Sequence, residues 1–350
     1  IVAYFSDWTT RDMPASAIPF DKITHLNYAF AILEDGSYRP VIQTDWLLRD
    51  VVAKAHAKDV KVAISIGGWT GSRYFSPMSA TAQGRKAFID ATVEFAKQYD
   101  LDGVDIDWEF PGRLGMACNL FDKENDARNF LTLLQELRAA LPKEKYISLA
   151  VRVQPFDGPN GPLTDVRKFA EPVDFITVMA YDINGSWSAT TGPNAPFKHS
   201  AAGGDPLSFT QAANAWVAAG FPKEKMLMGL PFYGRSARAP AAASAKARTM
   251  YMPQLKPVPK GDRDDAPWAE PCPGAPQALS GIWKWKNMRE EGLLANATMA
   301  GNGWERHWDH ETKTPWLLNR QDGHFISYDD PVSIKLKTDF VRCNGMGGVM

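Results

Sequence analysis

The fold is decided by one stretch of the chain, Leu101-Asp102-Gly103-Val104-Asp105-Ile106-Asp107-Trp108-Glu109-Phe110-Pro111. Its acidic and apolar residues alternate with the period of two that is typical of a β-strand. One face carries Asp105, Asp107 and Glu109, and the other carries Val104, Ile106 and Trp108. Because the apolar face must pack against helices, we expect the carboxylates to point into the interior of the protein.

Further short apolar runs resemble this strand, and amphipathic stretches separate several of them. Together the predicted strands are Ile1–Phe5, His25–Phe30, Val60–Ile66, Gly103–Trp108, Tyr146–Val151, Phe175–Met179, Met226–Leu230 and Gly347–Met350. Apolar residues keep helical spacing in three stretches between them: Trp46, Leu47, Val51 and Ala55; Phe88, Val93, Phe95 and Ala96; and Phe130, Leu133, Leu134 and Leu137. Strands that alternate with helices pair in parallel, and helices then cover both faces of the sheet. Eight such strands predict an α/β protein of the (β/α)8 TIM barrel type.

The chain is longer than the roughly 250 residues of a usual barrel, and the excess lies in one segment. We expect the seventh strand to end near Gly234 and the eighth to begin near Gly347, and one helix cannot fill that gap. Residues 236–326 contain a Pro-rich charged stretch and two Trp-rich runs, which favour a packed unit over a loose loop. We therefore predict a small α+β insertion domain at 236–326, and a catalytic barrel of residues 1–235 and 327–350.

Composition bounds the partners of the protein. The 350 residues include 39 basic and 40 acidic side chains, so the formal net charge is -1. This balance gives no reason to expect nucleic acid or a membrane surface as a partner, and we expect a monomer. No apolar run approaches the roughly 20 residues of a membrane helix. Cys118, Cys272 and Cys343 allow at most one internal disulfide and leave one thiol over; three free thiols are the alternative.

The carboxylate row Asp105, Asp107 and Glu109 is the strongest candidate for catalysis. Acids spaced about 6.8 Å apart along a strand in a low-dielectric interior repel one another, so at least one should hold a proton near neutral pH. A carboxylic acid that stays protonated can work as a general acid. A metal site would need a compact ligand cluster, which the sequence lacks, and Val, Ile and Trp would not flank a solvated edge. We therefore predict catalysis by Glu109, with no metal and no cofactor.

Leu101–Glu109 fits the DxxDxDxE pattern of the family 18 glycoside hydrolases, and other segments resemble the motifs of that family in the same order. Ser65–Trp69 resembles its SxGG motif, Met179–Asp182 its MxYD motif, and Gly229–Arg235 its seventh-strand motif. Tyr28–Phe30 and Gly347–Met350 resemble the end of the second strand and the start of the eighth. The resemblance covers nearly the whole chain. It implies a chitinase of the deep-cleft branch, in which the insertion is the α+β domain.

The resemblance also assigns roles to individual residues. Glu109 would protonate the glycosidic oxygen, Asp107 would first bond Glu109 and then hold the N-acetyl group of the substrate, and Asp105 would take up the displaced proton or charge. Tyr181 would donate to the acetamide oxygen. Asp102 opens the motif on the opposite face of the strand from the acid row, so we predict a structural role for it. The implied substrate-binding residues are Tyr4, Trp8, Phe30, Trp69, Met179, Asp182, Trp187, Tyr233 and Arg235. For Tyr4 and Phe30, packing inside the barrel is an equal alternative.

The implied reaction is hydrolysis of β-1,4 bonds between N-acetylglucosamine units of chitin or chitooligosaccharides, with retention. An ordinary retaining glycosidase needs a second carboxylate about 5–5.5 Å away across the scissile bond, whereas in family 18 the acetamide of the substrate attacks. No other acidic motif of this chain offers that nucleophile. Two alternatives are an endo-β-N-acetylglucosaminidase that cuts N-glycans and a chitin-binding, chitinase-like lectin. The Trp-rich cleft favours a linear chitin chain, and the presence of Glu109 speaks against a lectin.

The two ends of the sequence carry further expectations. Ile1 opens directly on a strand, which a mature or trimmed N-terminus explains. In relatives a Trp follows within two residues of the position of Met350 and forms the floor under the sugar. The resemblance therefore implies either a longer chain or a barrel that closes on a short eighth strand. Because chitin is extracellular, we expect a secreted protein.

Overall fold

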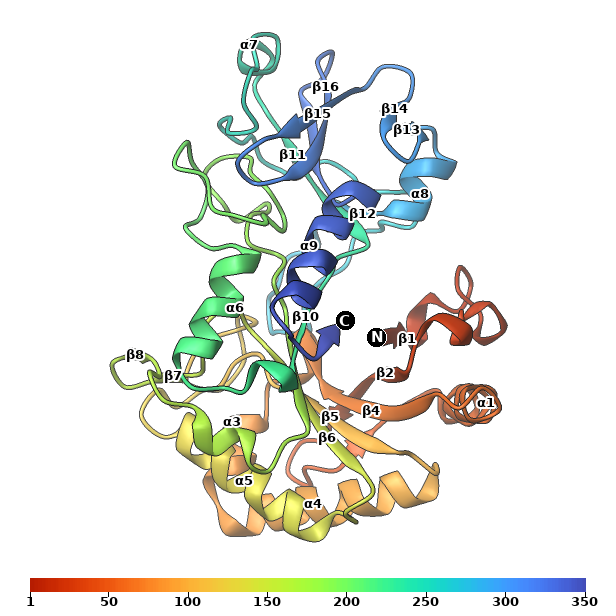
Figure 1. Ribbon diagram of the computed structural model, residues 1–350, viewed down its shortest axis with the longest axis vertical. Coiled ribbons are helices and arrows are strands. Elements are labelled where there is room, and N and C mark those ends of the chain that lie inside the picture. The colour runs from red at the N-terminus through yellow and green to blue at the C-terminus, as the bar shows by residue number, and fades with distance from the viewer. The chain divides into compact units, whose positions relative to one another are not determined.

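The computed structural model describes residues 1–350, which form two compact units (Figure 1). Unit 1 consists of Ile1–Val178, Ala215–Leu227 and Gly345–Met350. Unit 2 consists of Met179–Asn214 and Met228–Asn344. None of the helices is both long enough and apolar enough to span a lipid bilayer.

A parallel sheet of eight successive strands forms the TIM barrel. Its strands, in spatial order, are β1 (Val2–Ser6), β2 (His25–Leu33), β4 (Lys61–Gly67), β5 (Gly103–Asp107), β6 (Tyr146–Val151), β9 (Phe175–Val178), β10 (Met226–Met228) and β18 (Gly348–Val349). Spatial order equals chain order, as in a (β/α)8 barrel, in which each βαβ crossover leads to the neighbouring strand. The sequence predicted this barrel, and every predicted strand overlaps an observed one.

Helices and short hairpins fill the connections of the barrel. The helices are α1 (Asp45–His56), α2 (Gly68–Gly71), α3 (Phe75–Ala80), α4 (Ala82–Gln98), α5 (Asp126–Ala140) and α6 (Phe209–Ala218), and the 3-10 turns are η1 (Asp7–Thr9), η2 (Ala15–Ala17), η3 (Phe20–Lys22), η4 (Arg167–Ala170) and η5 (Lys223–Lys225). The short strands are β3 (Pro40–Val41), which pairs with β2, and β7 (Asp157–Gly158), which pairs with β8 (Gly161–Pro162). Figure 1 shows α3, α4 and α5 together along one side of the parallel strands.

The alternation in the stretch around β5 is realised as the sequence predicted. The ring of Trp108 stacks on Phe75 of α3, with 5.4 Å between the centroids, and meets Phe130 of α5 edge-on at 5.2 Å. On the opposite face, Asp105 accepts hydrogen bonds from residues of β1, β4 and β6. The apolar face therefore packs on helices, and the carboxylates line the barrel interior.

Unit 2 contains an antiparallel sheet between β10 and β18 in the chain. Its order is β12 (Ile282–Lys284), β11 (Tyr233–Arg238), β17 (His324–Ser327), β16 (Thr314–Asn319) and β15 (Glu305–Asp309). The hairpin of β13 (Leu294–Asn296) and β14 (Met299–Ala300) and the helices α7 (Ala241–Ser244), α8 (Trp285–Glu290) and α9 (Pro331–Cys343) complete the unit. An α+β insertion thus lies between the seventh and eighth barrel strands. The exact boundaries 236 and 326 stay a prediction.

Both faces of this sheet are buried, because its strands are apolar at consecutive positions. Trp316, Leu318 and Phe325 belong to one apolar cluster. The intervening residues Leu317 and Ile326 belong to the other, which also contains Trp283. The Trp-rich runs of the insertion therefore serve packing, as their number in the sequence indicated.

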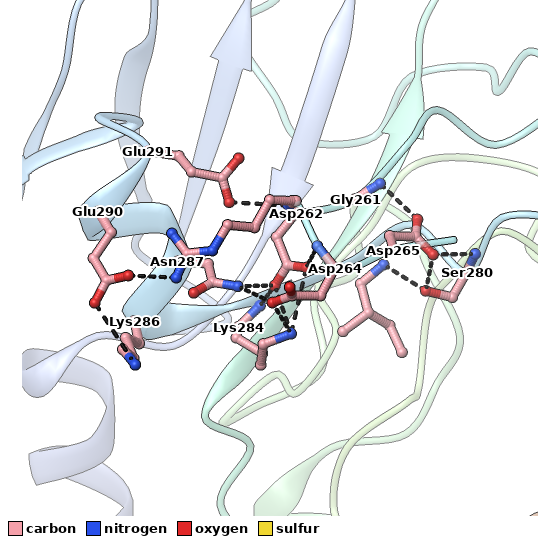
Figure 2. A network of polar contacts seen from close by, with 12 residues as sticks. Gly261, Asp262, Asp264, Asp265, Ser280, Lys284, Lys286, Asn287, Glu290 and Glu291 are labelled. Atoms are coloured by element: carbon pink, nitrogen blue, oxygen red, sulfur yellow. Dashed lines mark hydrogen bonds and ion pairs between the residues drawn. The ribbon is translucent and has the colours of Figure 1, made fainter. Parts of the chain in front are cut away.

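Buried carboxylates tie the loop before β12 to the sheet (Figure 2). Oδ2 of Asp265 accepts hydrogen bonds from the backbone N–H groups of Gly261, at 2.7 Å, and Gly281, at 3.0 Å. Its Oδ1 accepts bonds from the backbone N–H of Ser280 at 3.0 Å and from its hydroxyl at 2.8 Å. Asp262 accepts the backbone N–H of Lys284 at 2.9 Å. These acids are structural, because protein donors occupy their oxygens.

A second buried pair holds α9 to the rest of unit 2. The side chain of Lys337 is fully buried and lies 2.7 Å from Oδ1 of Asp329. It also donates to the carbonyl of Ala195 at 2.7 Å. A charge buried in this way is tolerated only because it has both a counter-ion and a carbonyl acceptor.

Two expectations about single elements were wrong. The seventh strand ends at Met228, and the Gly234 region belongs instead to β11 of the antiparallel sheet. Trp46 lies in the first turn of α1, in the predicted helix, but does not join its buried face, since 65% of its surface is exposed. Cys118 and Cys272 are disulfide-bonded and Cys343 is a free, exposed thiol, so the expectation of at most one disulfide is confirmed.

We predict that Asp265→Ala lowers the free energy of unfolding by about 2–4 kcal/mol, because it leaves the buried N–H groups of Gly261 and Gly281 without an acceptor. Unfolding in guanidinium chloride followed by Trp fluorescence measures the loss. Glu290→Ala is the matched control from the same network, since it removes only partly exposed ion pairs, with Arg263 and Lys286. Equal losses in the two variants would contradict this account of Asp265.

Candidate active site

The carboxylate row runs along β5 from the barrel interior to the end of the strand. Asp105 is fully buried, Asp107 is 4% exposed, and Glu109, just beyond the strand, is half-buried. The carboxyl ends of parallel barrel strands form the face on which the active sites of such barrels lie. Glu109 is therefore the member of the row that a substrate can reach.

Asp105 is held by three hydroxyl groups from three strands. Oδ2 accepts the Tyr4 hydroxyl at 2.6 Å and the Ser65 hydroxyl at 2.7 Å, and Oδ1 accepts the Ser148 hydroxyl at 2.6 Å. Burial raises the pKa of Asp105, and these hydrogen bonds oppose that rise. The bonds also fix the orientation of the carboxylate at the base of the row.

Asp107 is not held by hydroxyl donors in the way that Asp105 is. Its Oδ1 is buried and has no hydrogen-bond donor in the structure. Burial, followed by the negative charges of Glu109 and Asp105, raises the pKa of Asp107 well above its ordinary value. A proton shared by the row therefore resides readily on Asp107. Burial and the nearby Asp105 and Asp107 also raise the pKa of Tyr4 well above 10, so its hydroxyl remains a donor.

The backbone around Glu109 is fixed by two side chains. The hydroxyl of Ser72 accepts the backbone N–H of Glu109 at 2.8 Å and lies 3.1 Å from the carbonyl oxygen of Asp107. The side-chain amide of Asn119 donates to the carbonyl of Glu109 at 3.1 Å. These contacts position the acid from both sides of its peptide unit.

Two glycines, Gly67 at the end of β4 and Gly68 at the start of α2, permit close approaches to β5 and to the Phe30 ring of β2. A Cβ on Gly67 would lie 2.1 Å from the carbonyl oxygen of Asp107, and a Cβ on Gly68 would lie 2.7 Å from the Phe30 ring. Both residues also have positive φ angles, 114° and 75°. Glycine is therefore needed at both positions of the SxGG segment, because a side chain at Gly67 would collide with the backbone of Asp107 and one at Gly68 with the ring of Phe30.

Aromatic rings lead outward from the row within unit 1. The ring of Tyr4 lies 6.5 Å from that of Phe30, and Phe30 stacks on Trp8 with 6.0 Å between centroids. Trp8 is 65% exposed and Trp69, in α2, is 39% exposed. The buried end of this series packs inside the barrel, whereas its exposed indoles offer flat apolar faces to a ligand.

The remaining predicted residues lie in unit 2, and most of them gather around Asp182. Oδ1 of Asp182 accepts the Tyr233 hydroxyl at 2.7 Å and Nε of Arg235 at 2.6 Å. Its backbone N–H donates to Oδ1 of the buried Asn194 at 3.0 Å, and its φ angle is 56°. Because both side-chain bonds end on Oδ1 and the side chain is 37% exposed, Oδ2 can accept a ligand hydroxyl.

Two aromatic residues extend this group. The guanidinium of Arg235 lies 4.9 Å from the ring centroid of Trp187, which is 56% exposed. The ring of Tyr181 meets Tyr233 edge-on at 6.1 Å. Met179 immediately follows β9 and is half-buried. The structure thus joins five of the predicted residues into one group in unit 2, namely Tyr181, Asp182, Trp187, Tyr233 and Arg235.

Several positioning residues were not identified from the sequence. Ser148, Ser72 and Asn119 are single polar residues without a motif of their own. The one available signal was the isolated Ser148 in the apolar run Tyr146–Val151. Asp102 lies apart from the row: its Oδ2 accepts the backbone N–H of Val62 at 2.8 Å and lies 2.9 Å from Nε2 of His56.

Comparison with known proteins gives one consistent result. The family described as "Glycosyl hydrolases family 18" matches residues 1–350. A "chitinase-like effector" of Moniliophthora roreri is 38% identical over 358 residues, which cover 99% of this chain and 86% of the relative. "Chitinase A1" of Niallia circulans is 34% identical over 83% of this chain and 40% of its own length.

A solved structure agrees with this result. The crystal structure of a chitinase from Rhizomucor miehei matches with a TM-score of 0.91 and 36% identity, and the match covers 100% of this chain and 94% of the other. The match over the whole length, together with the carboxylate row at the end of β5, shows that this chain belongs to glycosyl hydrolases family 18 and is a glycoside hydrolase.

Proposed function

We propose that the protein is a chitinase that hydrolyses β-1,4 bonds between N-acetylglucosamine units with retention, by attack of the acetamide group of the substrate. The observation that carries this proposal is the buried Oδ1 of Asp107, which has no donor from the protein. Buried polar atoms are almost always hydrogen-bonded, and the N–H of a bound acetamido group would supply the missing donor.

The residues divide the reaction as follows. Glu109 gives its proton to the glycosidic oxygen while the acetamide oxygen attacks the anomeric carbon, so that the bond to the leaving sugar breaks. Asp107 becomes ionised and stabilises the positive charge on the acetamide nitrogen, and its proton passes toward Asp105. Tyr181 donates to the acetamide oxygen. Water then opens the cyclic intermediate and returns a proton to Glu109, which restores the acid.

The aromatic and polar residues serve binding in this proposal. Trp8, Trp69 and Trp187 stack on sugar rings, while Asp182, Tyr233 and Arg235 contact hydroxyl groups. Binding at several sugars supplies the energy that distorts the ring at the cleavage point. The substrate is chitin or its oligosaccharides. We further propose that the protein is secreted, since this polymer is extracellular, and that it acts as a monomer.

A chitin-binding protein without catalysis is the second candidate, because relatives at 38% and 33% identity are named "chitinase-like effector". The presence of Glu109 at the open end of the row, with Asp107 and Asp105 beneath it, favours the enzyme. A lectin would need the aromatic residues but not a proton-sharing row of acids.

Hydrolysis of chitohexaose by the parent protein and by Glu109→Gln distinguishes the two candidates. We expect the parent to release shorter oligomers and the variant to lose about 10²–10⁴-fold in kcat, because it removes the general acid. Mass spectrometry of the products measures both rates. Glu124→Gln, a change at an exposed carboxylate, is the matched control and should cleave at the parent rate.

Two outcomes of this experiment would contradict the proposed catalytic role. If the parent protein binds chitohexaose but releases no product, the protein is a lectin. If Glu109→Gln cleaves as fast as the parent, Glu109 is not the acid.

The pH dependence tests the shared proton. The negative charges in the row disfavour loss of its last proton, so an uncharged Asn at position 107 should make that loss easier. In Asp107→Asn we expect the alkaline limb of the kcat/KM profile of the residual activity to move to lower pH. Asp105→Asn should move the alkaline limb in the same direction but by less. The interaction between Asp107 and Glu109 raises the pKa of Asp107 more than the interaction between Asp107 and Asp105 does, and Asp105→Asn removes only the weaker one. An unmoved alkaline limb in Asp107→Asn would refute the proton-sharing row.

A further inference from the structure

A hollow on unit 1 lies outside the residues assigned so far. It has a volume of about 330 Å³ and lies between the segment after β1 and the first turns of α1. Its lining includes Trp46, Thr10, Pro14, Ser16, Asp50 and Lys54. This volume is at the lower end of the roughly 300–1,000 Å³ that small-ligand sites occupy. The hollow could therefore hold one or two sugar-sized groups.

Trp46 is the large aromatic side chain among the residues that line this hollow. It is 65% exposed, although the neighbouring Leu47 and Leu48 in the same turn of α1 are buried. A single exposed indole needs no special reason. Here, however, the indole borders a hollow that also offers the hydroxyl-bearing residues Thr10 and Ser16. An indole beside hydroxyl groups suits a ligand with flat C–H faces and many hydroxyls, as in a pyranose.

The charges of the hollow point to an uncharged ligand. Asp50 and Lys54 are its charged lining residues, and they form an ion pair one helical turn apart. Their charges therefore cancel. An anionic ligand such as a phosphate or a nucleic acid would find no unpaired cation there, and a cationic peptide would find no unpaired carboxylate. A neutral, hydroxyl-rich chain can still accept and donate hydrogen bonds at this pair.

The hollow is fixed to the same end of the barrel as Trp8. The hydroxyls of Tyr28, in β2, and Thr44, just before α1, are hydrogen-bonded at 2.7 Å. The Thr44 hydroxyl also donates to Oδ2 of Asp7 at 2.6 Å. Asp7 directly precedes Trp8 in η1, and Trp46 lies two residues after Thr44. The hydrogen bonds of Thr44 thus connect the two segments that carry the exposed indoles of Trp8 and Trp46. The 3-10 turn η2 also packs against α1.

We propose that this hollow, with Trp46 as its stacking platform, is an outer binding site for a neutral β-linked polysaccharide chain. The ligand is the same acetamido-sugar polymer that the proposed function assigns to the cleft, so this inference rests on that function. The site holds a part of a long chain beyond Trp8, and it takes no part in bond cleavage. Its contribution therefore grows with the length of the chain that is bound.

The experiment measures binding to insoluble chitin by co-sedimentation, with Glu109→Gln as the background so that the polymer is not consumed. In that background, Trp46→Ala should weaken the apparent Kd about five- to tenfold. Trp46→Tyr should stay within about twofold of the background, because it keeps a flat ring. Val217→Ala, which trims an exposed apolar side chain on α6, should bind as the background does.

Binding of chitotriose supplies the second readout, because in this proposal the hollow contributes only when a long chain is bound. Trp46→Ala should leave the Kd for chitotriose within about twofold of the background, since the effect depends on chain length. Equal binding of Trp46→Ala and the background to insoluble chitin would overturn the outer site. An equal loss for Trp46→Ala and Val217→Ala would overturn it too. Failure of the proposed function is seen separately, as absence of chitohexaose cleavage by the parent protein.

Discussion

The structure depends on one constraint, which is that a row of carboxyl groups must be held in the buried interior of the barrel. Burial disfavours their charge, and the neighbouring strands meet that cost with hydroxyl donors to Asp105 from Tyr4, Ser65 and Ser148. The next acid, Asp107, has no hydrogen-bond donor at Oδ1, and its pKa stays raised. The difference between these two environments favours Asp107 over Asp105 as the place where the row keeps a proton.

The surrounding structure maintains this arrangement. Gly67 lets β4 reach the backbone of Asp107, and Ser72 fixes the peptide unit of Glu109. Outside the barrel, Trp108 packs between α3 and α5, so the strand cannot rotate its acids away from the interior. In unit 2, Asp182 binds Tyr233 and Arg235, and the guanidinium of Arg235 supports Trp187. Each group of candidate residues is therefore ordered by contacts within its own unit.

The barrel could be predicted from the sequence because its signals are local. Alternation around Asp105 and the order of the apolar runs indicated eight strands, and these features do not depend on distant contacts. The break between β10 and β11 could not be predicted, because Tyr233–Arg238 is assigned to its sheet by partners far along the chain. Ser72, Ser148 and Asn119 were missed for the same reason. The exposure of Trp46 was missed because helical spacing does not show where the buried face of a helix ends.

The central claim is that the substrate supplies its own nucleophile, and the anomeric configuration of the first product tests it most directly. Chitohexaose and the parent protein are mixed, and anomer-resolved chromatography follows the products before mutarotation. The account predicts that the newly formed reducing ends are β, and that cellohexaose, which has no acetamido group, is not cleaved at a comparable rate. New reducing ends in the α configuration, or comparable cleavage of cellohexaose, would contradict the account.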